Sequence, residues 1–196
     1  LLPEGNIRKI VAKKELIAEE NVFSILDKIG GDCAGAISLY EEGYKKDNSE
    51  NDLKEISNDE LYTIIDNQAV SPLLTNENIR LSLAGAQSKF AVFLDDNKIY
   101  YPNDNYFSSH LIKPENPNWK DLVINECFCM RLANAEHIYT YPVEIWKIKN
   151  KLALLIYRYD RFKTPYKRMR LHQEDFCQAL GYPSNRKYQK DGGPSF

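Results

Sequence analysis

The chain carries at its centre Arg80-Leu81-Ser82-Leu83-Ala84-Gly85-Ala86-Gln87-Ser88-Lys89-Phe90-Ala91-Val92-Phe93-Leu94. Apolar and polar residues alternate at the start of this stretch, which predicts a strand. Small residues with one glycine interrupt the alternation from Ala84 to Ala86, and a second strand is predicted to begin at Phe90. The polar turn Asp95-Asp96-Asn97 then leads into a third strand, Lys98 to Tyr101. The pattern predicts consecutive strands of an antiparallel sheet.

A further apolar strand, Ser109 to Lys113, ends on a lysine. A hairpin with a small-residue loop followed by a strand-borne lysine suits the binding of a nucleoside triphosphate. Small residues let backbone N–H groups approach phosphate oxygens, and the lysine adds a point charge. The chain has neither G-x-x-x-x-G-K-[ST] nor G-x-G-x-x-G, so a simple bulge or bend at Gly85 is the alternative on pattern alone.

A helix is predicted from about Trp119 to His137. Its helical spacing places five residues on one face, namely Leu122, Glu126, Cys129, Met130 and Ala133. Glu126 would then lie within an apolar stripe, where an unpaired carboxylate is costly, and Lys113 is its expected partner. The alternative is that Glu126 flanks the stripe and reaches water.

Two more strands, Val143 to Lys149 and Lys151 to Asp160, are predicted to form a hairpin. The continuous apolar run Leu152 to Tyr157 is typical of a strand that is buried on both faces. Strands, a lysine-bearing strand, a glutamate-bearing helix and two further strands follow one another as in the N-lobe of a protein kinase. We therefore expect an α+β fold with an antiparallel sheet plus a helix, resembling a protein-kinase N-lobe.

A small α+β subdomain is expected before this lobe. Asn21 is a candidate N-cap for a helix that ends at Gly30, and Ser57 with Glu60 forms a capping-box pattern before another helix. Between them, Ala36 to Tyr40 is predicted as a short strand. No catalytic pattern occurs in this part of the chain.

The residues after Asp160 are strongly basic. Five of the next ten are cationic, namely Arg161, Lys163, Lys167, Arg168 and Arg170. A solvated loop is one interpretation, and a rim that meets an acidic or phosphorylated substrate is the other. A short helix with Phe176 is then predicted to stop at Gly181.

Composition limits the class of protein. The net charge of −2 over 196 residues gives no reason to expect nucleic acid or an anionic membrane as the main partner. Four cysteines without a C-x-x-C pair argue against a zinc site or a disulfide framework, and free thiols suit the cytoplasm. No apolar run approaches the length of a membrane span.

Several motifs resemble the HipA family of bacterial serine/threonine kinases. They are Ser82 to Lys89 as the phosphate loop, Asn125-Glu126, Tyr157-Arg158-Tyr159-Asp160-Arg161, Gln173 to Gly181, Lys187-Tyr188 and Asp191-Gly192-Gly193-Pro194. Leu1-Leu2-Pro3-Glu4 and Gly31 to Ala36 are similar to the N-terminal region of the family. The resemblance covers almost the whole chain. It implies a subdomain of HipA type at residues 1–76, a nucleotide-binding lobe at 77–160 and the start of a truncated C-lobe at 161–196.

The resemblance also implies a nucleotide site for ATP. Its residues would be Ala84, Gly85, Ala86, Gln87, Ser88, Lys89, Lys113, Tyr157, Arg158 and Tyr159, with Glu126 as the partner of the lysine. The last three residues would form the hinge, whose backbone binds the adenine edge. Tyr157 and Ser88 stand where family members often carry glutamate. Ser82 matches a serine that can be autophosphorylated in the family, and the added charge would oppose ATP binding. The alternative is that Ser82 is an ordinary serine of a strand.

No catalytic residue is assigned within this chain. The catalytic aspartate and the Mg²⁺ ligands of the family lie downstream in the C-lobe, and Asp160 is interpreted as structural. Residues 1–196 are therefore expected to be inactive alone. The family implies a toxin kinase that acts on a protein substrate, an aminoacyl-tRNA synthetase in known members. It implies a HipB-like antitoxin as partner and DNA contact only through that antitoxin. The alternative is a non-catalytic, kinase-like module that binds a partner.

Overall fold

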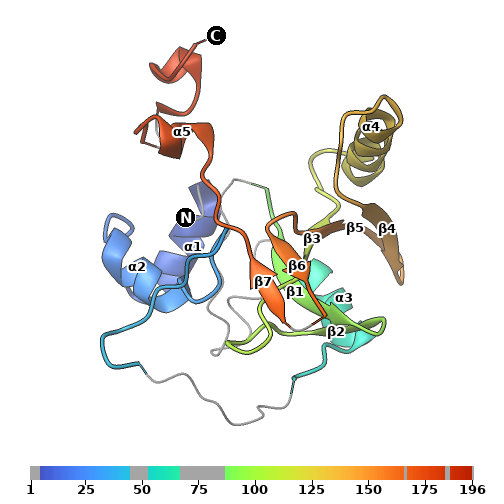
Figure 1. Ribbon diagram of the computed structural model, residues 1–196, viewed down its shortest axis with the longest axis horizontal. Coiled ribbons are helices and arrows are strands. Elements are labelled where there is room, and N and C mark those ends of the chain that lie inside the picture. The colour runs from blue at the N-terminus through green and yellow to red at the C-terminus, as the bar shows by residue number, and fades with distance from the viewer. Residues whose placement is uncertain (1–4, 45–52, 67–86, 166, 184–185, 196) are drawn as a thin grey trace.

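The computed structural model describes residues 5–44, 53–66, 87–165, 167–183 and 186–195. The predicted first strand and the small-residue loop, including Ser82 and Ala84 to Ala86, lie outside these residues. Figure 1 shows the sheet on one side of the molecule, the N-terminal helices on the other, and the C-terminal segment projecting away from both.

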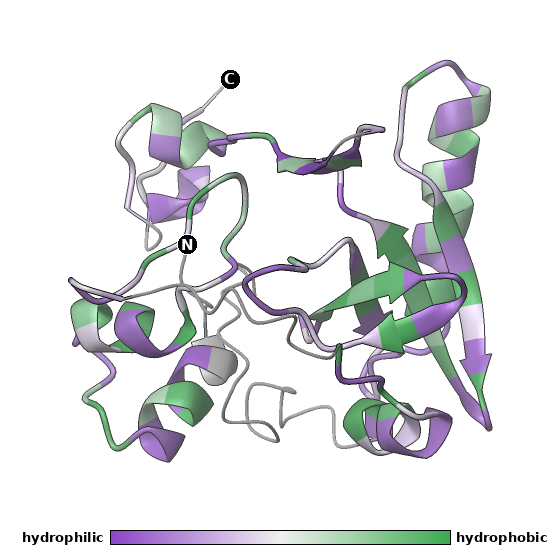
Figure 2. Cartoon of the chain, turned by 60° about the horizontal axis from the view of Figure 1, so that its bottom comes forward, coloured by the Kyte–Doolittle hydropathy of each residue, from purple (hydrophilic) through white to green (hydrophobic). Residues whose placement is uncertain are grey.

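A five-stranded antiparallel sheet forms the centre of the lobe. Its strand order is β2-β1-β3-β5-β4. The strands run over β1 Phe90–Asp95, β2 Lys98–Tyr100, β3 His110–Pro114, β4 Val143–Ile148 and β5 Lys151–Tyr157. The fold class expected from the sequence is thereby confirmed. Figure 2 shows hydrophobic residues gathered on these strands.

The two faces of the sheet carry different helices. On one face, α3 (Asn58–Asp66) packs Leu61, Ile64 and Ile65 into a cluster that includes Ala153 and Leu155 of β5. On the other, α4 (Leu122–Ala135) packs against Leu154 and Ile156. Successive residues of a strand point to opposite faces, so the alternation along β5 supplies both cores. Each helix begins close to its predicted start.

The N-terminal subdomain is built from α1 (Gly5–Lys14) and α2 (Val22–Ile29). Asn21 caps α2 as predicted, because its Oδ1 accepts a hydrogen bond from the Ser24 N–H at 3.0 Å. Val11, Ala12, Ile25 and Ile29 form a small separate core between the helices. A core of this size gives limited stability by itself, so contacts with the lobe are important for this subdomain.

The predicted strand Ala36 to Tyr40 is wrong. These residues have no strand pairing and follow an irregular path, although the Leu39 N–H donates to the Gly30 carbonyl at 2.8 Å. Arg170 instead binds the segment through the Ile37 carbonyl and the Ser38 hydroxyl. Side-chain donors thus occupy acceptors that a neighbouring strand would otherwise bind.

The basic stretch after Asp160 is a hairpin, not a loop. β6 (Arg161–Lys163) pairs with β7 (Arg168–Arg170). Arg161 is 8% exposed, so the interpretation of this stretch as a solvated loop is wrong for its first residue. Beyond the hairpin lie α5 (Phe176–Ala179) and the short 3-10 helix η3 (Gln189–Asp191), neither of which has a buried residue. No helix among the described residues is long and apolar enough to cross a membrane.

Candidate nucleotide-binding site

Lys113 lies near the end of β3, on the face of the sheet that α4 covers. Its Nζ donates to Glu126 Oε1 of α4, which confirms the predicted pairing. The side chains are 20% and 24% exposed, so the pair lies at the edge of the core and is open on one side. A cation held in this way can receive an anionic ligand without first losing its orientation.

The predicted apolar face of α4 is wrong by about one residue. The buried residues of the helix are Val123 and Cys127, with Met130 packed beside them, whereas Cys129 is exposed. Glu126 therefore flanks the buried stripe, as the alternative held, yet it still reaches Lys113. Its position on the flank of the helix places the carboxylate at the partly open edge of the core.

The described end of the predicted phosphate loop lies next to the strand that carries Lys113. Gln87, Ser88 and Lys89 are partly buried and precede β1, and Lys89 Nζ donates to the Gln87 carbonyl at 3.4 Å. The first residue of β1, Phe90, is paired with Ile112 of β3. The register thus brings the end of the loop next to the strand that carries the lysine.

The hinge segment, Tyr157 to Tyr159, begins at the last residue of β5. The Tyr157 N–H donates to the Pro142 carbonyl and the Arg158 N–H to the Ser109 carbonyl, at 3.2 and 3.0 Å. Tyr157 and Tyr159 are 43% and 53% exposed, whereas Arg158 is buried. The ring centroid of Tyr159 lies 5.9 Å from that of Tyr141. The tyrosine rings are accessible to a ligand, and the side chain of Arg158 is not.

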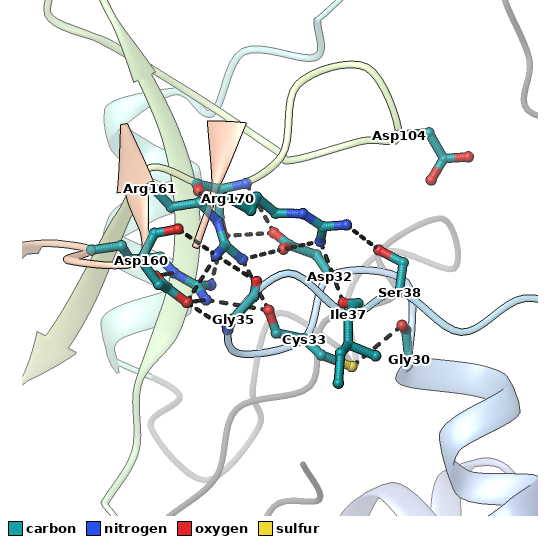
Figure 3. A network of polar contacts seen from close by, with 12 residues as sticks. Gly30, Asp32, Cys33, Gly35, Ile37, Ser38, Asp104, Asp160, Arg161 and Arg170 are labelled. Atoms are coloured by element: carbon teal, nitrogen blue, oxygen red, sulfur yellow. Dashed lines mark hydrogen bonds and ion pairs between the residues drawn. The ribbon is translucent and has the colours of Figure 1, made fainter. Parts of the chain in front are cut away.

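Arg158 belongs to a buried ion cluster, which we define as Asp32, Ser108, Arg158, Asp160 and Arg161. Arg158 Nε and Nη2 donate to the two oxygens of Asp160 at 3.0 and 2.8 Å, and its Nη1 donates to Ser108 Oγ at 2.8 Å. Arg161 Nη2 donates to Asp32 Oδ1 at 2.7 Å. Figure 3 shows Asp32 meeting the neighbouring residues Asp160 and Arg161, which come from a second segment of the chain. The position of Asp160 agrees with the structural role predicted for it.

Burial and these contacts shift the pKa values of Asp160 and Arg161. Burial tends to raise the pKa of the Asp160 carboxyl. The hydrogen bond and charge of Arg158, the charge of Arg161 and the Gly35 N–H outweigh burial and hold this pKa below its usual value. Burial lowers the pKa of Arg161, but its group stays cationic beside two carboxylates. Asp160 and Arg161 are therefore both charged and neutralise each other within the cluster.

Asp32 and Ser108 were not predicted as members of this cluster. Asp32 does stand among small residues in Gly31-Asp32-Cys33-Ala34-Gly35-Ala36, a composition typical of a buried segment. A carboxylate in such a segment requires cationic partners, and this signal could have indicated a buried ion pair. Its partner Arg161 lies 129 residues away, which no local pattern could identify.

Metal ligands do not gather in the part of the chain that the structure describes. No group of three or more His, Cys, Asp or Glu side chains is arranged there as a metal site would require. The cation that the described residues place for an anionic ligand is Lys113. A lysine held by a single carboxylate fits an anionic ligand such as the phosphates of a nucleotide.

Comparison with known protein families identifies the family of this chain. The sequence matches the HipA-like C-terminal domain over residues 81–196 and the HipA N-terminal domain over residues 1–40. The chain belongs to the HipA family. The family resemblance predicted from the motifs is thereby confirmed.

Individual relatives are all longer proteins. The chain is 38% identical to "Putative kinase Y4mE" of Sinorhizobium fredii, with 100% of this chain and 48% of that protein aligned. It is 31% identical to the serine/threonine-protein kinase toxin HipA of Shewanella oneidensis, with 98% of this chain and 44% of the relative aligned.

A solved structure shares the fold of this HipA-family chain. The complex of HipA, HipB and operator DNA from Shewanella oneidensis MR-1 contains a chain with a TM-score of 0.81 and 30% identity. That alignment covers 100% of this chain and 46% of the other. The chain thus spans less than half the length of each of these relatives, which are named as kinases or as a HipA complex.

Proposed function

We propose that this chain is the ATP-binding part of a serine/threonine protein kinase that phosphorylates a protein target. The observation that carries the proposal is the ion pair between Lys113 of β3 and Glu126 of α4, within a kinase-like N-lobe sheet. Protein kinases use a lysine of this kind to hold nucleotide phosphates, and a helix glutamate to orient it. The kinase names of the relatives support the same class of activity.

Each part of the site has a role in this proposal. Lys113 binds the phosphates, and Glu126 orients Lys113. Gln87, Ser88 and Lys89 continue the loop that covers the phosphates. The N–H groups of Tyr157 and Arg158 already donate within the lobe, so the backbone at the Tyr159 end of the hinge segment binds the adenine edge, and the exposed ring of Tyr159 packs on the base. ATP supplies the phosphoryl group, and the residues that hold Mg²⁺ are expected outside residues 1–196.

The test is ATP binding by the full-length protein, measured by calorimetry. We expect Lys113→Ala to weaken ATP binding by at least about tenfold, because a charge-assisted contact to phosphate is lost. Glu126→Ala should weaken it in the same direction. Lys151→Ala is the matched control, since Lys151 also forms an ion pair, with Asp66 of α3 at 2.7 Å. Unchanged affinity in the Lys113 variant would remove this residue from the site.

Regulation by a partner is part of the proposal. The related structure contains HipB and operator DNA, which supports a HipB-like antitoxin as partner and DNA contact only through it. An aminoacyl-tRNA synthetase is the substrate that the family resemblance implies. The four cysteines are all free thiols, which favours the reducing cytoplasm as the compartment.

A further inference from the structure

The N-terminal subdomain contacts the hinge segment through buried charges. Asp32 comes from the loop after α2, whereas Arg158, Asp160 and Arg161 come from the end of β5 and the start of β6. Asp32, Arg158, Asp160 and Arg161 are 7%, 5%, 2% and 8% exposed. Two carboxylates therefore meet the guanidinium groups of Arg158 and Arg161 in a site closed to water, where ionic hydrogen bonds are strong and strictly oriented. A third guanidinium, that of Arg170, is 19% exposed and lies 3.5 Å from Asp32 Oδ1.

Ser108 connects this cluster to the strand that carries Lys113. Its N–H and Oγ both donate to Asp32 Oδ2, at 2.9 and 2.6 Å, and its Oγ accepts from Arg158. Its carbonyl accepts from Arg161 Nε at 3.1 Å. Ser108 lies two residues before β3, and the next residue, Ser109, accepts the Arg158 N–H. Asp32 thus supports the start of β3 and the hinge together.

The loop of Asp32 fits closely around the cluster. The Gly35 N–H donates to Asp160 Oδ2 at 2.7 Å, and the Gly35 carbonyl accepts from Arg161 Nη1 at 2.8 Å. Gly35 has a φ of +72°, and a Cβ there would lie 3.0 Å from the Gln173 nitrogen. Only glycine adopts this positive φ and tolerates this close approach without strain. The loop from Asp32 to Gly35 therefore holds the side chains of Arg158, Asp160 and Arg161 in position.

We infer that Asp32 is a positioning residue for the adenine-binding hinge, so that the N-terminal subdomain contributes to nucleotide recognition without touching the nucleotide. The inference rests on the proposed function. Arg158 stands between Tyr157 and Tyr159, and both its backbone N–H and its guanidinium are bound. With Arg158 fixed at both ends, the backbone on either side of it has little freedom to turn. Loss of the Asp32 charge weakens the anchor of Ser108 and leaves Arg161 with one of its two carboxylate partners.

The structure offers a matched control in Asp104. This residue also joins the N-terminal subdomain to the lobe, because Tyr40 and Tyr44 both donate their hydroxyls to it. Figure 3 shows Asp104 apart from the cluster. Asp104→Asn weakens the attachment of the subdomain but leaves the contacts of Arg158 and Arg161 intact. A difference between the variants at positions 32 and 104 therefore separates hinge positioning from general attachment.

The experiment compares ATP and GTP binding to the full-length protein and its variants by calorimetry. The two nucleotides share their phosphates and differ in the base, so their affinity ratio reports on the hinge alone. We expect Asp32→Asn to weaken ATP binding about tenfold, as for one misaligned hydrogen bond to the base, with GTP affinity unchanged. Ser108→Ala, which keeps every charge paired, should weaken ATP binding about threefold. Asp104→Asn should retain the wild-type ratio.

The outcomes distinguish the inference from the proposed function. If the wild-type protein binds ATP and the Asp32 and Ser108 variants keep its ATP-to-GTP ratio, the positioning role is wrong and the nucleotide site stands. An equal effect of Asp104→Asn would also overturn it. If the wild-type protein binds neither nucleotide, the proposed function fails and the inference fails with it. Should Asp32→Asn not fold, the Ser108 variant decides.

Discussion

His110 shows how a single residue of β3 is held uncharged. The side chain is 4% exposed, its Nδ1 lies 2.8 Å from Ser109 Oγ, and its Nε2 has no hydrogen-bond partner among the described residues. The Tyr157 ring lies 4.1 Å away between centroids. Burial lowers the pKa of His110 to about 4, against a weaker opposite effect of Glu144. The folded protein therefore resists protonation of this imidazole.

A pH dependence of stability follows from this lowered pKa. An unfolded chain takes up the proton near the ordinary pKa of 6.5, whereas the folded chain does so only near 4. The contribution of uncharged His110 to the free energy of unfolding is therefore fully present above about pH 6.5 and is lost as the pH decreases toward 4. We expect urea unfolding of the full-length protein to show this fall between pH 7 and pH 5, and His110→Gln to reduce it.

The matched variant for this test is His172→Gln, which alters an exposed histidine beyond β7. It should keep the wild-type fall in stability. If His110→Gln and His172→Gln lose stability with pH to the same extent as the wild type, the uncharged state of His110 makes no contribution. The decline would then come from other groups.

At the scale of the element, α4 carries two apolar stripes and buries only one. Val123 and Cys127 face Leu154 and Ile156 of β5, and a second stripe of Ile124, Phe128 and Leu132 is 46%, 62% and 47% exposed.

We expect Val123→Ala to lower the free energy of unfolding by about 2 kcal/mol through lost burial and a small cavity. Ile124→Ala, one residue along, should change it by less than about 0.5 kcal/mol. Chemical denaturation of the full-length protein checks both, and equal losses would contradict the assignment of the buried face.

The same helix shows how far the sequence predicts this fold. Short apolar runs located β1 and β3, and the cost of an unpaired carboxylate predicted the partner of Glu126 correctly. The buried face of α4 was mispredicted because apolar residues occur on several sides of the helix, the predicted face with Leu122 and Met130 among them, and periodicity alone cannot choose between these sides. The ion cluster was missed for a different reason. Its longest contacts join segments 125 to 129 residues apart, so the carboxylate among small residues at Asp32 indicates a buried ion pair without identifying the partner.

At the scale of the whole molecule, the sheet and the N-terminal subdomain form one body through the ion cluster, and the C-terminal segment stands apart from it (Figure 1). None of the described residues from 171 to 195 is buried. Phe176, Leu180 and Tyr188 are 85%, 59% and 59% exposed, an unusual density of exposed apolar side chains for so short a segment. Such a segment gains stability when a larger body of protein covers it.

The relatives, of which this chain spans less than half, lead to a prediction on that segment. In full-length protein we expect the amides of α5 to be protected from hydrogen exchange. In a purified fragment of residues 1–196 they should exchange rapidly, because no buried side chain holds the helix. The amides around Cys127 of α4, which is buried in the structure, are the internal control.

The fragment should also transfer no phosphate from ATP to any protein, since no catalytic aspartate is assigned in it. Phosphate transfer by the fragment would place the catalytic group within residues 1–196 and contradict the division into lobes, whereas rapid exchange of α5 in both forms would contradict only the covering of the segment.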